Sequence, residues 1–119
     1  MFRRLAFNVF AHNRDDHAKN TSFVLHADGA WRLSPAYDLT FSNGPSGEHW
    51  TTVDGEGRAP KPSHLLSAAK SAGLKDLEAQ AIVDEVRTAV AAFPAAAREA
   101  GCSAASIKRV TRAIAAGSH

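Results

Sequence analysis

The two halves of this chain differ sharply in residue type, and that difference limits the folds open to it. Eight of the nine aromatic residues lie in the first 50 positions, whereas 17 of the 24 alanines lie in residues 61–119. Alanine favours helices, so the second half is predicted to be helical. Leu, Ile, Val and Phe make up only 24 of the 119 residues, near the lower limit for a self-sufficient core. We therefore expect one mainly helical domain, with a core that leaves room for completion by a partner or by further sequence.

Local patterns predict the order of the elements. Apolar residues at helical spacing predict a helix over residues 2–12, and two short strands, 21–25 and 31–33, flank Asp28-Gly29, a signal for a two-residue hairpin turn. Residues 42–63 are rich in Gly, Pro and Ser and predict an irregular segment, either a mobile loop or a surface-wrapping insert. Four more helices are predicted, capped or opened by Ser63, Lys75, Pro94 and Ser103, and ending near residues 72, 92, 101 and 116. The fold class is mainly α with a small β-hairpin.

Charge and cysteine content exclude several classes of protein. With 14 basic and 12 acidic residues the net charge is +2, which excludes a polybasic tail and an acidic disordered chain. A single cysteine, Cys102, excludes an internal disulfide and a Cys-only metal site, and it suits a reducing compartment. No apolar run approaches the about 20 residues of a membrane span, and the start of the chain lacks a secretory signal. We expect a single soluble, cytoplasmic domain over residues 1–119 that does not enter a membrane.

Side chains capable of chemistry are concentrated between Asp15 and Asp38. Asp15, Lys19 and Asn20 lie within six residues of one another, and Asp38 follows the predicted hairpin. Phosphoryl transfer needs a carboxylate that orients the attacking hydroxyl, together with oxygen ligands for the Mg²⁺ that bridges the nucleotide phosphates. Because a hairpin folds the chain back on itself, it brings residues about twenty positions apart close together. This order of side chains therefore favours a phosphoryl-transfer site.

The same segment resembles a known family of kinases. Protein kinases carry H-R-D-x-x-x-x-N, then a hairpin, then D-F-G. Here His12-Asn13-Arg14-Asp15 precedes Asn20 at the matching offset, and Tyr37-Asp38-Leu39 stands where D-F-G falls. His12 is one place early and the trailing glycine is absent. The longer pattern D-x-H-x-K-N-x-S, then L-x-P-x-Y-D, resembles the C-terminal region of HipA-like serine/threonine kinases, the toxins of HipA/HipB toxin–antitoxin modules. The resemblance covers residues 5–41.

This resemblance implies a role for each matching residue. Asp15 corresponds to the catalytic aspartate that engages the substrate hydroxyl. Asn20 and Asp38 correspond to the residues that bind Mg²⁺ and, through it, ATP; these are the implied cofactors. His17 and Lys19 match catalytic-loop positions, and Lys19 is expected either to neutralise phosphate or to pair with Asp15. The neighbouring Asp16 stands where the family often has a small residue, and we expect it to be solvated.

The resemblance also implies parts that these 119 residues do not supply. A kinase needs a glycine-rich loop over the phosphates and a strand lysine paired with an acid. The glycines of the irregular segment come after Asp38 and do not form that loop: Gly44, Gly47, Gly55 and Gly57. We therefore expect a C-lobe fragment of a protein-kinase-like fold, divided into residues 1–41, 42–62 and 63–116. We expect the fragment to be inactive alone and to need a separate N-lobe chain. A HipB-like antitoxin and a protein substrate are the other expected partners.

Several alternatives remain open. The polar residues 13–20 are also compatible with a capping and turn segment. The histidines His12, His17 and His26 are compatible with a zinc site, although their spacing favours ordinary surface histidines. Trp31 and Tyr37 are interpreted as packing residues, and Trp50 as either a plug over the site or a partner contact. Three basic residues of the last helix favour a solvated face over direct DNA binding: Lys108, Arg109 and Arg112. Self-association is left open, as is a non-catalytic pseudokinase remnant that acts as a binding module.

Overall fold

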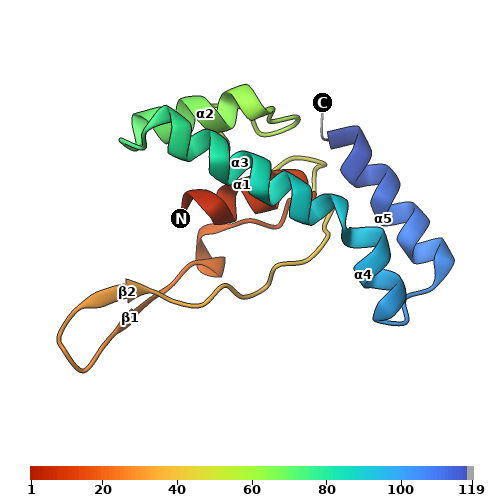
Figure 1. The fold of residues 1–119 in the computed structure, drawn as a ribbon, viewed down its shortest axis with the longest axis horizontal. Coiled ribbons are helices and arrows are strands. Elements are labelled where there is room, and N and C mark those ends of the chain that lie inside the picture. Colours follow the sequence, from red (N-terminus) through yellow and green to blue (C-terminus); the bar gives the residue numbers. More distant parts are fainter. Residues whose placement is uncertain (118–119) are drawn as a thin grey trace.

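The computed structural model describes residues 1–117 as a helical domain with one β-hairpin, which confirms the predicted fold class. The elements follow in the order α1 (Phe2–Phe10), a 3-10 turn η1 (Ala18–Asn20), β1 (Phe23–Leu25), β2 (Trp31–Leu33), α2 (Pro62–Ser71), α3 (Asp76–Ala91), α4 (Phe93–Glu99) and α5 (Ala104–Gly117). Figure 1 shows α3 lying along α1, with α2 at one end and the α4–α5 pair at the other.

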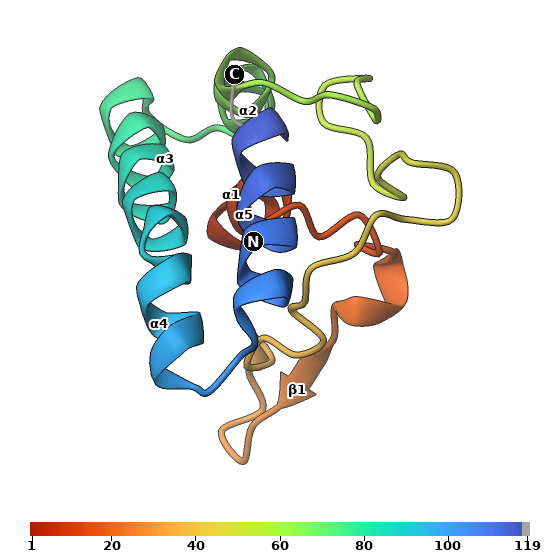
Figure 2. The ribbon, with the colours of Figure 1, turned by 90° about the vertical axis from the view of Figure 1, so that its right-hand side faces the viewer.

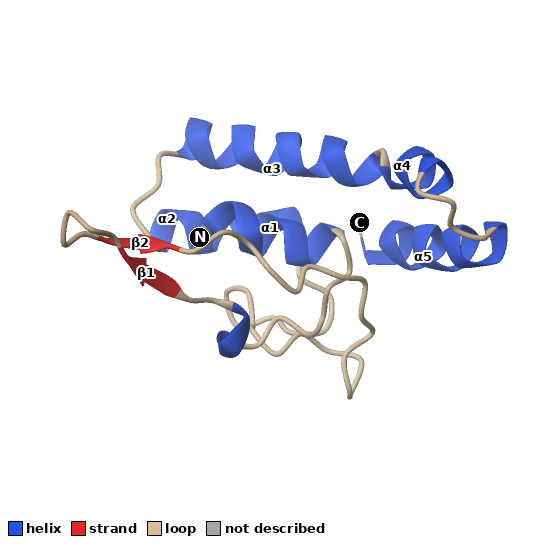
Figure 3. Cartoon of the chain, turned by 90° about the horizontal axis from the view of Figure 1, so that it is seen from below, coloured by secondary structure: helices blue, strands red, loops and turns tan. Residues whose placement is uncertain are grey.

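The helices and the non-helical segments occupy different sides of the molecule. Figure 3 shows the helices gathered on one side and most of the connecting loops on the other, with the hairpin projecting at one end. The core lies between α1, α2 and α3 and consists of Ala6, Val9, Phe10, Val53, Leu65, Val83, Val86 and Val90. Seven of these residues are helical, whereas Val53 comes from the irregular segment and is only 1% exposed. That segment, seen at the right of Figure 2, therefore wraps over the helices and is anchored in their core.

The hairpin forms where the sequence predicts it, but its turn is longer than the Asp-Gly signal implies. The strands pair antiparallel, with Phe23 opposite Leu33 and Leu25 opposite Trp31. The ladder continues to the hydrogen bond from the His26 amide to the Ala30 carbonyl, 3.0 Å, which leaves three residues in the turn. Gly29 has φ +78° while Asp28 does not adopt a positive φ, so the two-residue type I′ turn is excluded. The two-residue prediction was wrong because a single left-handed glycine suffices in the longer turn.

Two helix ends differ from the predictions, and one predicted cap is confirmed. The first helix ends at Phe10 rather than residue 12, because His12 adopts a left-handed φ of 56°. Helix α2 begins at Pro62, not after Ser63, because proline fits the first helical position and the Lys61 amide donates to His64 Nδ1 at 2.9 Å. Helix α5 is capped as predicted, by Ser103 Oγ, which accepts from the Ser106 amide at 3.2 Å.

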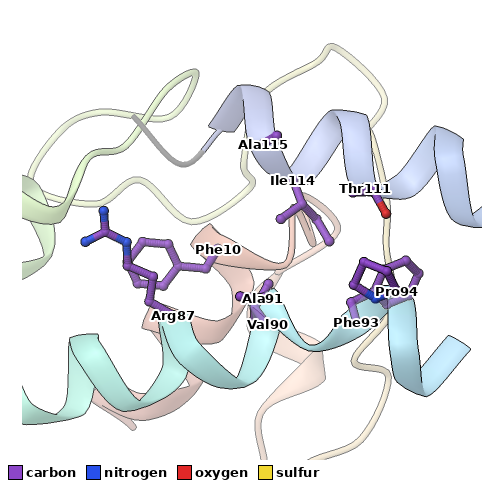
Figure 4. Close-up of a pocket in the computed structure, with 9 residues that line it drawn as sticks. All are labelled: Phe10, Arg87, Val90, Ala91, Phe93, Pro94, Thr111, Ile114 and Ala115. Atoms are coloured by element: carbon purple, nitrogen blue, oxygen red, sulfur yellow. The ribbon is translucent and has the colours of Figure 1, made fainter.

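An apolar cavity of about 290 Å³ lies among the helices. Figure 4 shows it between α1, α3, α4 and α5, lined by residues that include Phe10, Val90, Phe93 and Ile114. None of the residues with candidate chemistry contributes to its wall. Among the described residues, no helix combines the length and hydropathy that a transmembrane span requires.

Candidate functional site

The segment with the candidate chemistry leaves α1 through a short parallel contact with the wrapping segment, by which we mean residues 42–61. The left-handed residue His12 turns the chain, and its carbonyl accepts from the Ser42 amide at 3.0 Å. The next residues continue the contact, since the Arg14 amide donates to the Ser42 carbonyl at 3.1 Å. His12 also stacks on Phe41, with ring centroids 5.5 Å apart. These contacts fix the direction in which the following residues, 13–20, leave the helix; we call this stretch the Asp15 loop.

The Asp15 loop is closed on itself by its own polar groups. Asn20 Nδ2 donates to the backbone carbonyl of Asp15, five residues earlier, at 2.9 Å. The Asp15 carboxylate is half-exposed, and its Oδ1 lies 3.7 Å from His17 Nε2. Among the described residues no ion pair joins Asp15 to Lys19, so His17 and not Lys19 is the basic neighbour of this carboxylate. The loop thus holds a solvent-accessible carboxylate beside an imidazole.

Asp16 has the opposite environment from its neighbour, which corrects the expectation that it is solvated. Its side chain is 1% exposed, and Oδ2 lies 2.9 Å from His49 Nδ1, itself on a side chain 2% exposed. Oδ1 accepts from the Thr51 amide at 3.2 Å, and the Asp16 carbonyl accepts from Thr51 Oγ1 at 2.6 Å. A buried carboxylate needs such partners, because an unpaired buried charge is costly. Asp16 is therefore an anchor between the Asp15 loop and the wrapping segment.

Arg14 forms a second anchor on the other side of Asp15. Its guanidinium donates to the Gly47 carbonyl at 2.5 Å and to the Arg58 carbonyl at 2.9 Å. Gly44 is part of the same contact, since a Cβ at this position, with φ +68°, would lie 2.5 Å from the Glu48 carbonyl. The two residues that flank Asp15 in sequence thus both hold the wrapping segment, and Asp15 lies between the two attachment points.

The segment that carries Asp38 is joined to the Asp15 loop at the base of the hairpin. The Ser34 amide donates to the Ser22 carbonyl at 2.9 Å, and beyond it Tyr37 Oη donates to the Lys19 carbonyl at 2.8 Å. Asn20 and Asp38 are each one residue away from this last bond. Asp38 itself is exposed and has a left-handed φ of 54°, a conformation that is uncommon outside glycine and enriched at functional positions.

Of the exposed aromatic residues, Trp31 and Tyr37 correct one interpretation and Trp50 leaves another open. Trp31 is 67% exposed, because a two-stranded hairpin offers no second layer to cover it, and Tyr37, beyond the hairpin, is 41% exposed. Neither belongs to the core, as their interpretation as packing residues would require. Trp50 is 60% exposed, between the two residues that bind Asp16.

Few side chains in this region can bind a metal ion or exchange a proton. Among residues 1–117, no three side chains of His, Cys, Asp or Glu lie together as a metal site. Asn20 donates through its amide nitrogen, which leaves Oδ1 as its ligand atom, and Asp38 offers an exposed carboxylate. Burial lowers the pKa of His12, helped by the nearby Arg14 and His49 and opposed by a hydrogen bond with Asn43.

Comparison with known proteins identifies the family. The chain is a helical domain in which a loop that bears a carboxylate precedes a hairpin. The family model described as the HipA-like C-terminal domain matches residues 1–93. The chain therefore belongs to the HipA-like C-terminal domain family. Neither the curated proteins nor the solved structures contain a significant match to it. The matched region covers α1 to α3 and the whole candidate site, whereas nearly all of α4 and all of α5 lie beyond it.

Sequence reasoning missed the anchors of the site. His49 and Thr51 lie 33 and 35 residues from Asp16, in a segment with no periodic pattern, so no local signal indicates that they bind it. Arg14 was noted only as part of a motif.

Proposed function

We propose that this domain is the C-terminal catalytic region of an ATP-dependent serine/threonine kinase. The supporting observation is that one hydrogen bond ties Asn20 to the Asp15 carbonyl, and a second ties Lys19, the residue before Asn20, to Tyr37, the residue before Asp38. These two bonds favour an arrangement in which a carboxylate, an amide oxygen and a second carboxylate act together at the base of the hairpin. The order of these groups is that of a phosphoryl-transfer site.

In the proposed reaction the acceptor is a serine or threonine hydroxyl of a protein. Asp15 orients this hydroxyl and takes its proton as the oxygen bonds to the γ-phosphorus of ATP and the bond to the β,γ-bridging oxygen breaks, releasing ADP. His17 Nε2 lies 3.7 Å from the Asp15 carboxylate and is its basic neighbour, and Lys19 offers an exposed positive charge to the phosphates. Since the anchors at Arg14 and Asp16 flank Asp15, the position of the base is held from both sides.

Asn20 Oδ1 and the Asp38 carboxylate are the groups that fit Mg²⁺. This ion usually takes one or two protein ligands together with phosphate oxygens and waters, so two ligands suffice. An ion held by these two residues would supply positive charge to neutralise the phosphates. The 119 residues contain no glycine-rich loop before a helix, and we propose that a nucleotide-binding lobe outside them completes the site.

A second function is favoured by the exposed hairpin. Four apolar side chains of the two strands are more than 40% exposed: Phe23, Val24, Leu25 and Trp31. Exposed apolar surface of this kind is typical of a protein contact. In this alternative the domain is a non-catalytic module that binds an antitoxin-like protein or a complementary kinase lobe.

Calorimetric titration with Mg²⁺-ATP separates the two functions. We expect Asp38→Asn to lose the metal-dependent part of the binding. Asp54→Asn is a matched control, because Asp54 is also exposed and left-handed, with φ 53°, and asparagine tolerates that conformation. Equal binding by Asp38→Asn and the control would contradict the kinase assignment. If none of the three proteins binds nucleotide, Mn²⁺ binding without nucleotide is measured instead, and Asp38→Asn should again bind more weakly than the control.

A further inference from the structure

A small polar cavity lies beside the Asp15 loop and is not used by the proposed transfer. Its volume is about 90 Å³, and its polar wall consists of His12, Arg14, His49 and Arg58, with Val9 and Pro60 among its apolar neighbours. Both histidines are more than nine-tenths buried, at 8% and 7% exposed. A buried site needs about 10–15 Å³ to hold one water, so this cavity has room for several waters or for one tetrahedral oxyanion.

The polar side chains that line the cavity all carry or can carry positive charge, and no acid is among the lining residues. Arg14 is the distinctive member. Two of its nitrogens bind the Gly47 and Arg58 carbonyls, its Nε is buried without a partner, and among the described residues no carboxylate pairs with it. A partly buried guanidinium that is compensated only by carbonyl oxygens is a favourable position for an anion.

The acidic groups near the cavity are already engaged. Asp16 Oδ2 is bound to His49 Nδ1, and Glu48 Oε1 lies 2.6 Å from an Arg58 nitrogen. Glu56 accepts from the Arg58 and Ala59 amides and so points to the backbone. Each carboxylate is matched to a partner, which leaves the charge of Arg14 uncompensated. Burial is the main cause of the lowered pKa of His12, and the positive charges of Arg14 and His49 add to it.

We propose that this cavity binds a small tetrahedral oxyanion with the chemistry of a phosphate group. Arg14 and the Arg58 nitrogen that Glu48 does not bind supply charge-assisted donors, and the two imidazoles complete the polar wall. An anion in this position would join the Asp15 loop to the wrapping segment, because Arg14 belongs to the first and Arg58 to the second. The phosphate group has two sources, free inorganic phosphate or a phosphorylated serine or threonine side chain, and both present the same oxygens to the cavity.

The test is a titration of the ¹⁵N-labelled chain with inorganic phosphate in low-chloride buffer, followed by NMR. The titration contains no nucleotide, so its result does not depend on kinase activity. We expect saturable shifts confined to amides of residues 12–14 and 48–60. Arg14→Gln should weaken binding by about tenfold or more, as expected for the loss of a charge-assisted hydrogen bond. A parallel titration with O-phosphoserine distinguishes the sources, because tighter binding than that of free phosphate indicates a phosphorylated side chain.

Two further variants keep the proposal falsifiable if Arg14→Gln disturbs the fold. Arg58→Gln removes a lining cation but keeps the Arg58 carbonyl that Arg14 binds, and we expect a several-fold loss of affinity. Arg32→Gln is the matched control, since Arg32 is also an exposed arginine paired with an acid, on the distant hairpin, and it should bind as the unmodified chain does. Absence of saturation, or equal affinity in Arg58→Gln and Arg32→Gln, would mean an adventitious ion only and would overturn the proposal.

Discussion

The hairpin and the wrapping segment are both short, non-helical and mixed in composition, yet they are stabilised in opposite ways. The hairpin has regular backbone pairing but no cover, and Trp31 on it is 67% exposed. The wrapping segment has almost no regular pairing, yet Val53 within it is 1% exposed and His49 is bound to a buried carboxylate. Backbone regularity and burial are therefore independent here, because side-chain partners distant in sequence hold the irregular segment.

This difference explains how the candidate site is built. Asp15 and Asn20 lie at the junction of the two regions, with the hairpin base on one side and the anchored wrapping segment on the other. The exposed hairpin carries Asp38 back towards the loop, while Arg14 and Asp16 hold the loop from behind. In the proposed kinase, the anchored wrapping segment would position Asp15, and the hairpin would leave the Asp38 side of the site open to solvent.

The largest effect is expected from removing the anchor Asp16. Asp16→Ala leaves His49 and the Thr51 amide without their acceptor, and breaking a buried pair from one side costs about 3–5 kcal/mol. The adjacent Asp15→Ala is the matched control, because its half-exposed carboxylate should contribute less than about 1 kcal/mol. Urea unfolding of both variants measures the two values. Equal losses would contradict the contrast between the two carboxylates.

A smaller loss is expected from the apolar anchor of the wrapping segment. Val53→Ala removes two methyl groups from the core, worth about 2 kcal/mol including the cavity left behind. Val24→Ala makes the same change on the hairpin, where the side chain is 45% exposed, and should cost less than about 0.5 kcal/mol. Thermal and urea unfolding of the pair compare the regions directly. A similar cost at both positions would show that the wrapping segment is no better anchored than the hairpin.

His12 should make stability depend on pH. Its pKa in the folded state is lowered from 6.5 by burial and by Arg14 and His49, so below pH 6.5 the unfolded chain binds a proton that the folded chain resists. The stabilisation is complete above this value and is lost as pH falls below it, with a slope of at most about 1.4 kcal/mol per pH unit. His12→Asn keeps a residue that tolerates the left-handed φ and should reduce this slope. The free energy of unfolding between pH 7 and 5 measures both slopes, and equal slopes would refute the burial effect.

The smallest effect is expected at the ion pair of the hairpin. Arg32 and Asp28 pair on an exposed turn, with both side chains more than half exposed, so Arg32→Gln should change stability by less than about 0.5 kcal/mol. Hydrogen exchange of the hairpin amides provides a second measurement, and they should exchange faster than the Val53 amide, which is bonded to the Glu56 carbonyl at 2.8 Å. A large loss of stability would mean that the hairpin is held by more than its base.

Local patterns predicted the parts of the fold that depend on local interactions. The helices follow from apolar spacing and from caps such as Ser103, and the hairpin follows from two strand signals around Asp28-Gly29. The motif from Asp15 to Asp38 also indicated the family, which the match over residues 1–93 shows. Errors at Ser63 and at the hairpin turn involve single residues, where a neighbouring proline or glycine offered a better local solution.

The burial of polar side chains was not predictable in this way. The partners of Asp16 lie more than 30 residues away in a segment without periodicity, so one sequence gives no reason to bury this carboxylate and leave its neighbour exposed. Trp31 illustrates the converse, since a large aromatic residue suggests packing but the two-stranded hairpin leaves 67% of this residue exposed. In both cases the outcome depends on tertiary or partner contacts rather than on residue type.

The most direct test of the central claim is a titration of the ¹⁵N-labelled chain with Mn²⁺ in place of Mg²⁺, followed by paramagnetic line broadening, with and without ATP. We expect the amides near Asn20 and Asp38 to broaden first, and Asp38→Asn to remove this effect while Asp54→Asn retains it. That result would place the metal between the Asp15 loop and the hairpin, as a phosphoryl-transfer site requires. Broadening that is centred on other carboxylates, or that survives in Asp38→Asn, would contradict the account.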